Sequence, residues 1–445
     1  MTHDNNTRRR FLALSGSATL AGLAGCTDRF GSEASEENGS DPSNESTSGT
    51  TEQSETNSYE PPALTVETEY NSREEFGQPG ESFDDFEDLD AWETVQGSAE
   101  ADEDVAFEGS QSLKLTAEDG ENVIVERSIE TTDLTDREFS LAVQTSTPGN
   151  VAVDIRLFDI YGGYAHHQLR SVTYRTPDIG WFRTNPGVFE ESSVPLERDV
   201  VDEIQIIVYN TGDAEVWVDD LRVHDKPEKG YVVLCWDDGF DDFYDTASPL
   251  HDEYGVNAVQ AAVRQWTRGQ REGIMTVGQL KERQEAGDQI VAHGTHTHLA
   301  QMDEDSLRDS LRRDKNWAVQ NEFQGGHYIV YPHNSFDQTT LDVISDYYYA
   351  GGFNQAGDVN LTGVHGFDPL VLPRTIGHDL DIAMRCVDLA VQHRQCTILN
   401  FHAFDLDNTI DTDEYEQLLE HIDSKGDALE VIDFDDLWTM RRNGH

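Results

Sequence analysis

Short runs of alternating apolar and polar residues fill the chain between residues 63 and 226, with Gly, Asp, Asn and Pro between them. Residues 151–157 and 204–209 are two such runs. A period of two places successive side chains on opposite faces of a strand, and many short strands joined by turns are typical of an antiparallel sandwich. We therefore predict an antiparallel β-sandwich domain over residues 63–226.

The pattern changes at residue 230, where more continuously apolar strands begin to alternate with helical stretches. Residues 231–235, 289–292 and 397–401 are predicted strands of this buried kind. Buried strands that alternate with helices indicate an α/β domain with a helix-covered sheet. We assign this second domain to residues 230–445.

Two segments before residue 63 have patterns of another kind. Residues 7–12 look like a twin-arginine motif, and the apolar run after them is shorter than the about 20 residues that cross a bilayer. Residues 23–26 resemble a lipobox that ends at Cys26. We predict that residues 1–26 are a twin-arginine signal, and that a lipid on Cys26 anchors the protein to the extracellular face of the cell membrane.

Residues 27–62 consist largely of Ser, Thr, Glu, Asn and Gly. Such a segment buries too little apolar surface to offset its ordering entropy. We predict a disordered, acidic linker here that holds the folded domains away from the membrane.

The net charge of the chain limits the classes of molecule that it can bind. The chain has 31 Lys and Arg against 87 Asp and Glu, a formal net charge of -56. A surface this acidic repels a phosphate backbone, so no nucleic-acid partner is expected. The same balance resembles proteins of extreme halophiles, in which molar salt screens the self-repulsion, and an ordinary acidic secreted protein is the alternative.

Side chains suited to metal and proton chemistry follow the predicted strands of the α/β domain. They are Asp237 and Asp238 after residues 231–236, His293, His296 and His298 after residues 289–292, and His402 after residues 397–401. Adjacent carboxylates on an extended chain point in opposite directions, so one can bind a cation while the other faces the substrate water. Two imidazoles and one carboxylate form a metal site with positions left open. A further histidine can protonate a leaving group.

In this order the motifs resemble those of the polysaccharide deacetylase family, the metal-dependent de-N-acetylases of chitin, peptidoglycan and related glycans. The matching motifs are residues 236–239, 293–298, 331–334 and 400–402, and the segments 250–258 and 429–437 also resemble the family. The resemblance covers about half the chain. It implies an irregular (β/α) barrel that acts on an N-acetylated polysaccharide substrate.

The resemblance also implies a role for each matching residue. Asp237 would be the general base and His402 the general acid. Asp238 and two histidines would hold a divalent metal, with Zn²⁺ expected and cobalt or manganese as alternatives. The oxyanion would form beside backbone N–H groups near Tyr331 and Pro332.

The histidine motif departs from the family spacing. The family's two ligands are usually four residues apart, whereas His293 is followed by histidines three and five residues later. Alignment on Leu299 favours His296 as the second ligand, with His298 as the alternative.

Two further family features are missing at their usual places. No arginine opens the third motif, but Arg374 resembles a position that some subfamilies use to keep the base ionised; a surface arginine is the alternative reading. No Asp-x-x-Asp-Trp motif precedes His402, so the sequence does not identify what orients this imidazole.

The predicted sandwich resembles the jelly-roll carbohydrate-binding modules of secreted polysaccharide enzymes. Trp92, Trp181, Tyr161 and Tyr164 are candidates for stacking on sugar rings, and core packing is the alternative for each. Asp219 and Asp220 are expected at a turn or a structural cation. For the whole protein, two other functions stay open: a degenerate, non-catalytic glycan-binding surface lipoprotein, and a metal amidohydrolase or esterase of small molecules.

Overall fold

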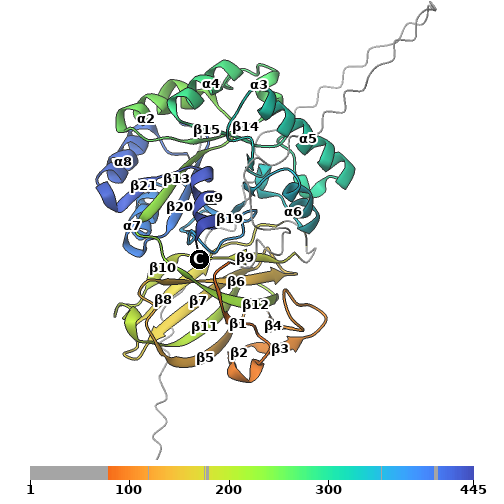
Figure 1. The fold of residues 1–445 in the computed structure, drawn as a ribbon, viewed down its shortest axis with the longest axis vertical. Coiled ribbons are helices and arrows are strands. Elements are labelled where there is room, and N and C mark those ends of the chain that lie inside the picture. Colours follow the sequence, from red (N-terminus) through yellow and green to blue (C-terminus); the bar gives the residue numbers. More distant parts are fainter. Residues whose placement is uncertain are drawn as a thin grey trace, which may run out of the picture.

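The computed structural model describes residues 79–118, 120–174, 176, 180–351, 353–404 and 409–444. The predicted signal over residues 1–26, its Cys26 and the predicted linker over residues 27–62 lie outside the described residues. None of the described helices combines the length and the apolar character needed to cross a membrane. The described chain forms an antiparallel part and an α/β part that lie against each other (Figure 1).

The first part contains two antiparallel sheets that fit the predicted sandwich. One sheet has the order β3-β4-β12-β6-β9 with β1 beside β12, and the other has the order β10-β8-β7-β11-β5-β2. The strands are β1 (Glu81–Asp84), β2 (Glu93–Gln96), β3 (Ser98–Asp102), β4 (Ser112–Ala117), β5 (Val123–Thr132), β6 (Arg137–Thr145), β7 (Val151–Asp159), β8 (Tyr164–Leu169), β9 (Phe182–Thr184), β10 (Val188–Glu191), β11 (Val201–Asn210) and β12 (Ala214–Asp225).

The second part is the predicted α/β domain, and every strand pair in its sheet is parallel. The strands are β13 (Gly230–Trp236), β14 (Val259–Ala262), β15 (Gln289–Ala292), β16 (Tyr328–Ile329), β17 (Ala350–Gly351), β18 (Phe353–Ala356), β19 (Leu372–Ile376), β20 (Cys396–Phe401) and β21 (Leu429–Val431). The order is β17-β16-β15-β14-β13-β20-β19-β18, with β21 beside β13. Because β17 and β18 form the two ends of this order and are almost consecutive in the chain, the sheet curls back on itself into an irregular barrel.

Helices surround this sheet (Figure 1). They are α2 (Ser248–Tyr254), α3 (Arg264–Arg268), α4 (Val277–Ala286), α5 (Glu304–Gln320), α6 (Gln338–Ser345), α7 (Leu380–His393), α8 (Thr412–Asp423) and α9 (Phe434–Asn443). Their apolar faces cover the strands, which explains why β13, β15 and β20 are buried along almost their whole length.

One of the hydrophobic clusters of the described residues spans both parts. A single cluster of buried side chains joins Ile155 of the sandwich to Leu370 of the α/β part. Polar contacts also cross the junction: the side-chain amide of Gln395 accepts a hydrogen bond from the N–H of Val188 at 2.7 Å and donates one to its carbonyl at 3.1 Å. The sandwich is therefore packed against the α/β part rather than tethered to it.

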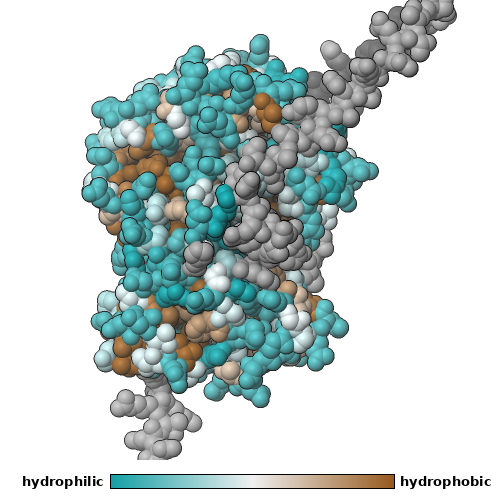
Figure 2. Space-filling view, in the orientation of Figure 1, coloured by the Kyte–Doolittle hydropathy of each residue, from teal (hydrophilic) through white to brown (hydrophobic). Residues whose placement is uncertain are grey.

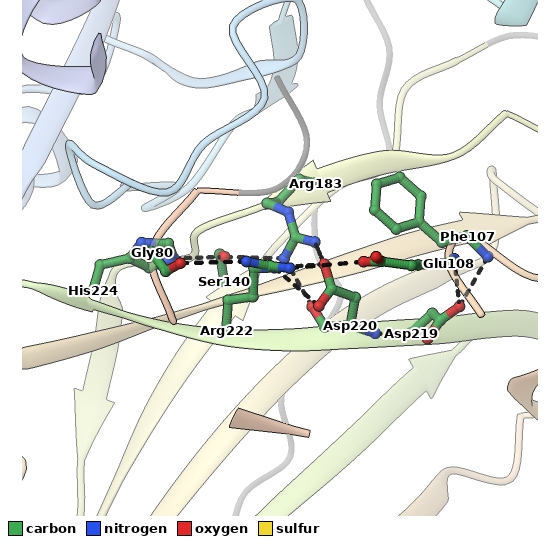
Figure 3. A network of polar contacts seen from close by, with 9 residues as sticks. All are labelled: Gly80, Phe107, Glu108, Ser140, Arg183, Asp219, Asp220, Arg222 and His224. Carbon is green, nitrogen blue, oxygen red and sulfur yellow. Dashed lines mark hydrogen bonds and ion pairs between the residues drawn. The ribbon is translucent and has the colours of Figure 1, made fainter. Parts of the chain in front are cut away.

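A buried polar network lies at the same junction (Figure 3). The guanidinium of Arg183 pairs with the carboxylate of Asp220, and the carbonyl of Arg183 accepts a hydrogen bond from the N–H of Asp368 at 3.1 Å. Asp219 accepts hydrogen bonds from the backbone N–H groups of residues 107 and 108 at 2.8 and 3.2 Å. The two carboxylates thus fix a loop and an arginine within the sandwich.

The face of the molecule in Figure 2 is mostly hydrophilic, with apolar side chains gathered in small, separate patches. Among the described residues, the large hydrophobic side chains with the most exposure are Val95, Ile160, Tyr161 and Val194. A surface of this kind agrees with the excess of acidic residues in the sequence.

Candidate active site

The carboxyl ends of parallel strands meet at one edge of a sheet, which is where α/β barrels place their chemistry. β13, β15, β19 and β20 all run parallel within this sheet. The side chains just beyond the ends of β13, β15 and β20 are Asp237, Asp238, His293, His296 and His402, and Arg374 lies within β19. Segments up to 165 residues apart in the chain therefore form one site.

Asp238 lies at the centre of a candidate metal set. One of its oxygens, Oδ1, is 3.5 Å from Nε2 of His293 and 3.5 Å from Nδ1 of His296. These distances are too long for good hydrogen bonds. They are close to the about 3.4 Å expected between two ligand atoms of a tetrahedral zinc ion with bonds of about 2.0–2.1 Å.

The hydrogen bonds of these groups also fit a metal. Oδ1 of Asp238 and Nδ1 of His296 are buried without a hydrogen-bond partner. Nδ1 of His293 donates to the carbonyl of Val330 at 2.9 Å, so in the neutral ring the lone pair of Nε2 is directed toward Asp238. The described residues contain no group of three or more His, Cys, Asp or Glu side chains with the general geometry of a complete metal site. The two 3.5 Å spacings and the unpartnered atoms favour a metal at this position.

The structure places His296, and not His298, beside Asp238. The ring of His298 stacks on that of His333, with centroids 4.3 Å apart. His296 has a φ of 55°, and Asp238 one of 72°, conformations that non-glycine residues rarely adopt and that occur at functional sites. The ring of Trp266 packs against His296 with centroids 4.4 Å apart. The sequence analysis missed both Trp266 and His333.

Asp237 forms a buried ion pair. Both of its carboxylate oxygens accept hydrogen bonds from Nη1 of Arg374, at 2.9 and 3.0 Å. Burial alone would raise the pKa of Asp237, but the charges of Arg374, His293 and His402 outweigh it and hold the pKa below its ordinary value. Arg374 is thus a partner of the candidate base and not a surface arginine.

Replacing Arg374 by methionine should lower the free energy of unfolding by about 3 kcal/mol or more, because it leaves the Asp237 carboxylate buried without a counter-charge. Burial would then be opposed by His293 and His402 alone, so the pKa of Asp237 rises and the acid limb of any pH–activity profile moves to higher pH. Denaturant unfolding at neutral pH measures the first effect. Arg308→Met is the matched control, because Arg308 forms only exposed ion pairs, which contribute about 0–1 kcal/mol. Equal losses of unfolding free energy in the two variants would contradict the assignment of Arg374 as the buried partner of Asp237.

His402 follows β20 and is only partly buried. Burial lowers its pKa, although the carboxylates of Asp237 and Asp238 act in the opposite direction. Its Nδ1 lies 3.3 Å from Nε2 of His378, a residue that the sequence analysis also missed. His378 follows β19, so its position at the same sheet edge was the available signal.

Tyr331 and Pro332 contribute packing next to the candidate site. The Tyr331 side chain is fully buried and donates a hydrogen bond to the carbonyl of Leu370 at 2.9 Å, so its ring belongs to the core. Gly294, with a φ of 56°, lies so close to Pro332 that an added Cβ would be 3.0 Å from Cγ of the proline. Pro332 thus packs on the loop that carries His293 and His296. An oxyanion contact from the backbone here stays a prediction.

The candidate sugar-stacking residues of the sandwich differ in exposure. Trp92 is a core residue, as the core-packing alternative predicts: its ring stacks on Phe86, and its N–H donates to Asp84 at 2.7 Å. Trp181 and Tyr164 are half-buried, and Tyr161 is 71% exposed. Sugar binding by the sandwich stays a prediction.

Comparison with known proteins gives one family match. Residues 224–352 match the family model described as polysaccharide deacetylase. This range contains Asp237, Asp238, His293 and His296 but ends before Arg374 and His402, which are placed at the site by the structure. No curated protein gives a match.

Three solved structures are similar at low identity. A deacetylase from Streptococcus pyogenes in complex with acetate has 23% identity over 32% of this chain and 62% of that chain, with a TM-score of 0.29. A family 4 carbohydrate esterase from Streptomyces lividans in complex with acetate has 15% identity over 45% of this chain and 90% of that chain, with a TM-score of 0.30. A family 11 carbohydrate-binding module from Clostridium thermocellum has 14% identity over 32% of this chain and 94% of that chain, with a TM-score of 0.26. The chain thus spans less than two thirds of the Streptococcus protein. The part of the chain that carries the carboxylate and histidine motifs is similar to the polysaccharide deacetylase family.

Proposed function

We propose that this protein is a metal-dependent hydrolase that removes N-acetyl groups from a cell-surface or extracellular polysaccharide. The observation that carries the proposal is one sheet edge with two adjacent carboxylates in different environments. Asp237 is held ionised by Arg374, and Asp238 faces two imidazoles at 3.5 Å. A base and a cation-binding carboxylate side by side are what amide hydrolysis by activated water requires.

Each residue then has a defined task. Asp238, His293 and His296 would hold the divalent metal, with Zn²⁺ expected, and when bound this ion would polarise the acetamide carbonyl and lower the pKa of water. Asp237 takes a proton from the attacking water. The carbon–nitrogen bond breaks as His402 gives a proton to the departing sugar amine. One proton is taken and one is given, and the products are acetate and a free amino sugar.

The test is to measure metal content and acetate release on the same purified sample in molar salt. Substrates should include polymeric N-acetylated glycans, short N-acetylated oligosaccharides, and small acetamides and esters. We expect about one metal ion per chain and release from glycans. Release only from the small compounds would support the amidohydrolase or esterase alternative, and binding of a glycan without any release would support the non-catalytic alternative.

We also propose that the protein is exported by the twin-arginine route and anchored by a lipid on Cys26 at the outer face of the membrane. Cys26→Ser should move the protein from the membrane fraction to the soluble fraction, because serine cannot carry the thioether-linked lipid. Thr27→Ser, which keeps the cysteine, is the matched control. A Cys26→Ser protein that stays in the membrane fraction would contradict the anchor.

A further inference from the structure

The imidazole of His402 is in contact with a second imidazole. Nδ1 of His402 and Nε2 of His378 are 3.3 Å apart, and the two ring planes are inclined at 70°. Nearly perpendicular rings that meet through nitrogen atoms have the geometry of an N–H donated to a lone pair. The rings of His298 and His333 differ from this pair, because their planes are inclined at only 26° and the rings stack.

The backbone places the two histidines opposite each other. Ile376 of β19 is in register with Asn400 of β20, and His378 and His402 lie two residues beyond this pair. In a parallel sheet such positions are neighbours, and the ladder continues here because the N–H of Gly377 donates to the carbonyl of Asn400 at 2.9 Å.

Gly377 permits this close approach. A Cβ at this position would be 2.5–2.6 Å from the ring of Phe401, so any larger residue would displace this buried ring of β20. The contact between His378 and His402 is therefore built into the strand pair and does not depend on a chance meeting of two surface side chains.

We propose that His378 is the positioning residue that orients His402 as the general acid. This inference rests on the proposed function. Nδ1–H of His402 donates to the lone pair of His378 Nε2, which leaves Nε2 of His402 as the nitrogen that carries the proton for the departing amine. After the transfer His402 is neutral and keeps the Nδ1–H tautomer, because the hydrogen bond to His378 holds that proton in place.

The arrangement also explains how the chain works without a carboxylate motif before His402 in the sequence. A positioning group needs only to accept one hydrogen bond at a fixed point, and a neutral imidazole can do so, although its hydrogen bond is weaker than one to a carboxylate. Two imidazoles this close share at most one extra proton, because like charges at this distance disfavour double protonation. His378 thus stays the acceptor when His402 carries its charge.

The experiment compares His378→Leu, which removes the acceptor at similar size, with His378→Gln, whose side-chain oxygen can replace Nε2. We expect His378→Leu to lower kcat by about 10- to 100-fold, the usual effect of losing a supporting hydrogen bond, with KM changed less than about 3-fold. His378→Gln should restore most of kcat. His421→Leu is the control, because His421 pairs with Asp388 on the exposed surface of α8 and α7.

A second measurement is independent of activity. ¹⁵N NMR of histidine-labelled protein, with the His402 signals assigned by their loss in His402→Gln, reports which ring nitrogen carries the proton. We expect the Nδ1–H tautomer in the wild type and in His378→Gln, and a mixture in His378→Leu. An unchanged tautomer and an unchanged kcat in His378→Leu would overturn the inference. A wild type that shows the expected tautomer but releases no acetate would instead count against the proposed function alone.

Discussion

His296→Ala should remove most of the bound divalent metal, whereas His298→Ala should leave it in place. Nδ1 of His296 lies 3.5 Å from Oδ1 of Asp238, while the ring of His298 stacks on that of His333. Loss of the ion removes several kcal/mol of charge stabilisation, which corresponds to more than about 10³-fold in turnover.

The measurement is the metal-to-protein ratio after dialysis against a metal-buffered solution of molar salt, followed by acetate release on the same samples. His293→Ala serves as the positive control, because its Nε2 faces the same oxygen of Asp238. If the His296 and His298 variants keep equal amounts of metal, or if only the His298 variant loses it, the assignment of His296 is wrong.

Asp237→Asn and His402→Ala should each lower turnover by about 10²- to 10⁴-fold, the range for removal of acid or base assistance. Both variants should keep the metal, because neither side chain is in the set formed by Asp238 and the two imidazoles. Asparagine retains a hydrogen-bond acceptor for Arg374 but cannot take a proton from water, so the loss in Asp237→Asn reports on the base itself.

This pair of variants separates an enzyme from a glycan-binding protein. In an enzyme, the bell-shaped pH profile of the wild type should lose its acidic limb in Asp237→Asn and its basic limb in His402→Ala, with His421→Ala unchanged as a control. A metal-loaded wild type that releases no acetate from any N-acetylated glycan, with both variants indistinguishable from it, would favour a non-catalytic binding protein.

Much of the α/β domain could be predicted because its signals are local. The predicted strand over residues 231–235 is the centre of β13, and the predicted run over residues 289–292 is β15. Buried parallel strands are apolar along their whole length, so they stand out from the acidic surroundings. The carboxylates and histidines directly after such strands then had to meet at one sheet edge, and in the structure they do.

The features that the sequence left open or did not reveal depend on contacts between distant segments. Arg374 pairs with a carboxylate 137 residues away, so its sequence neighbours do not distinguish it from a surface arginine. His378 acquires its position from the register of β19 with β20, and Trp266 acquires its contact from the left-handed backbone at His296. Trp92 could not be assigned from its neighbours either, because its burial depends on how the two sheets of the sandwich close.

The core shared by the two domains makes the sandwich a non-exchangeable part of this protein. In enzymes joined to accessory domains by flexible tethers, one domain can be swapped for another without harm to its neighbour. Here the amide of Gln395 forms two hydrogen bonds with Val188 on the other side of the junction, and apolar side chains of both parts pack in one cluster. Excision of the sandwich would expose that interior to water, and any glycan bound by the sandwich would be held in a fixed position relative to the α/β domain.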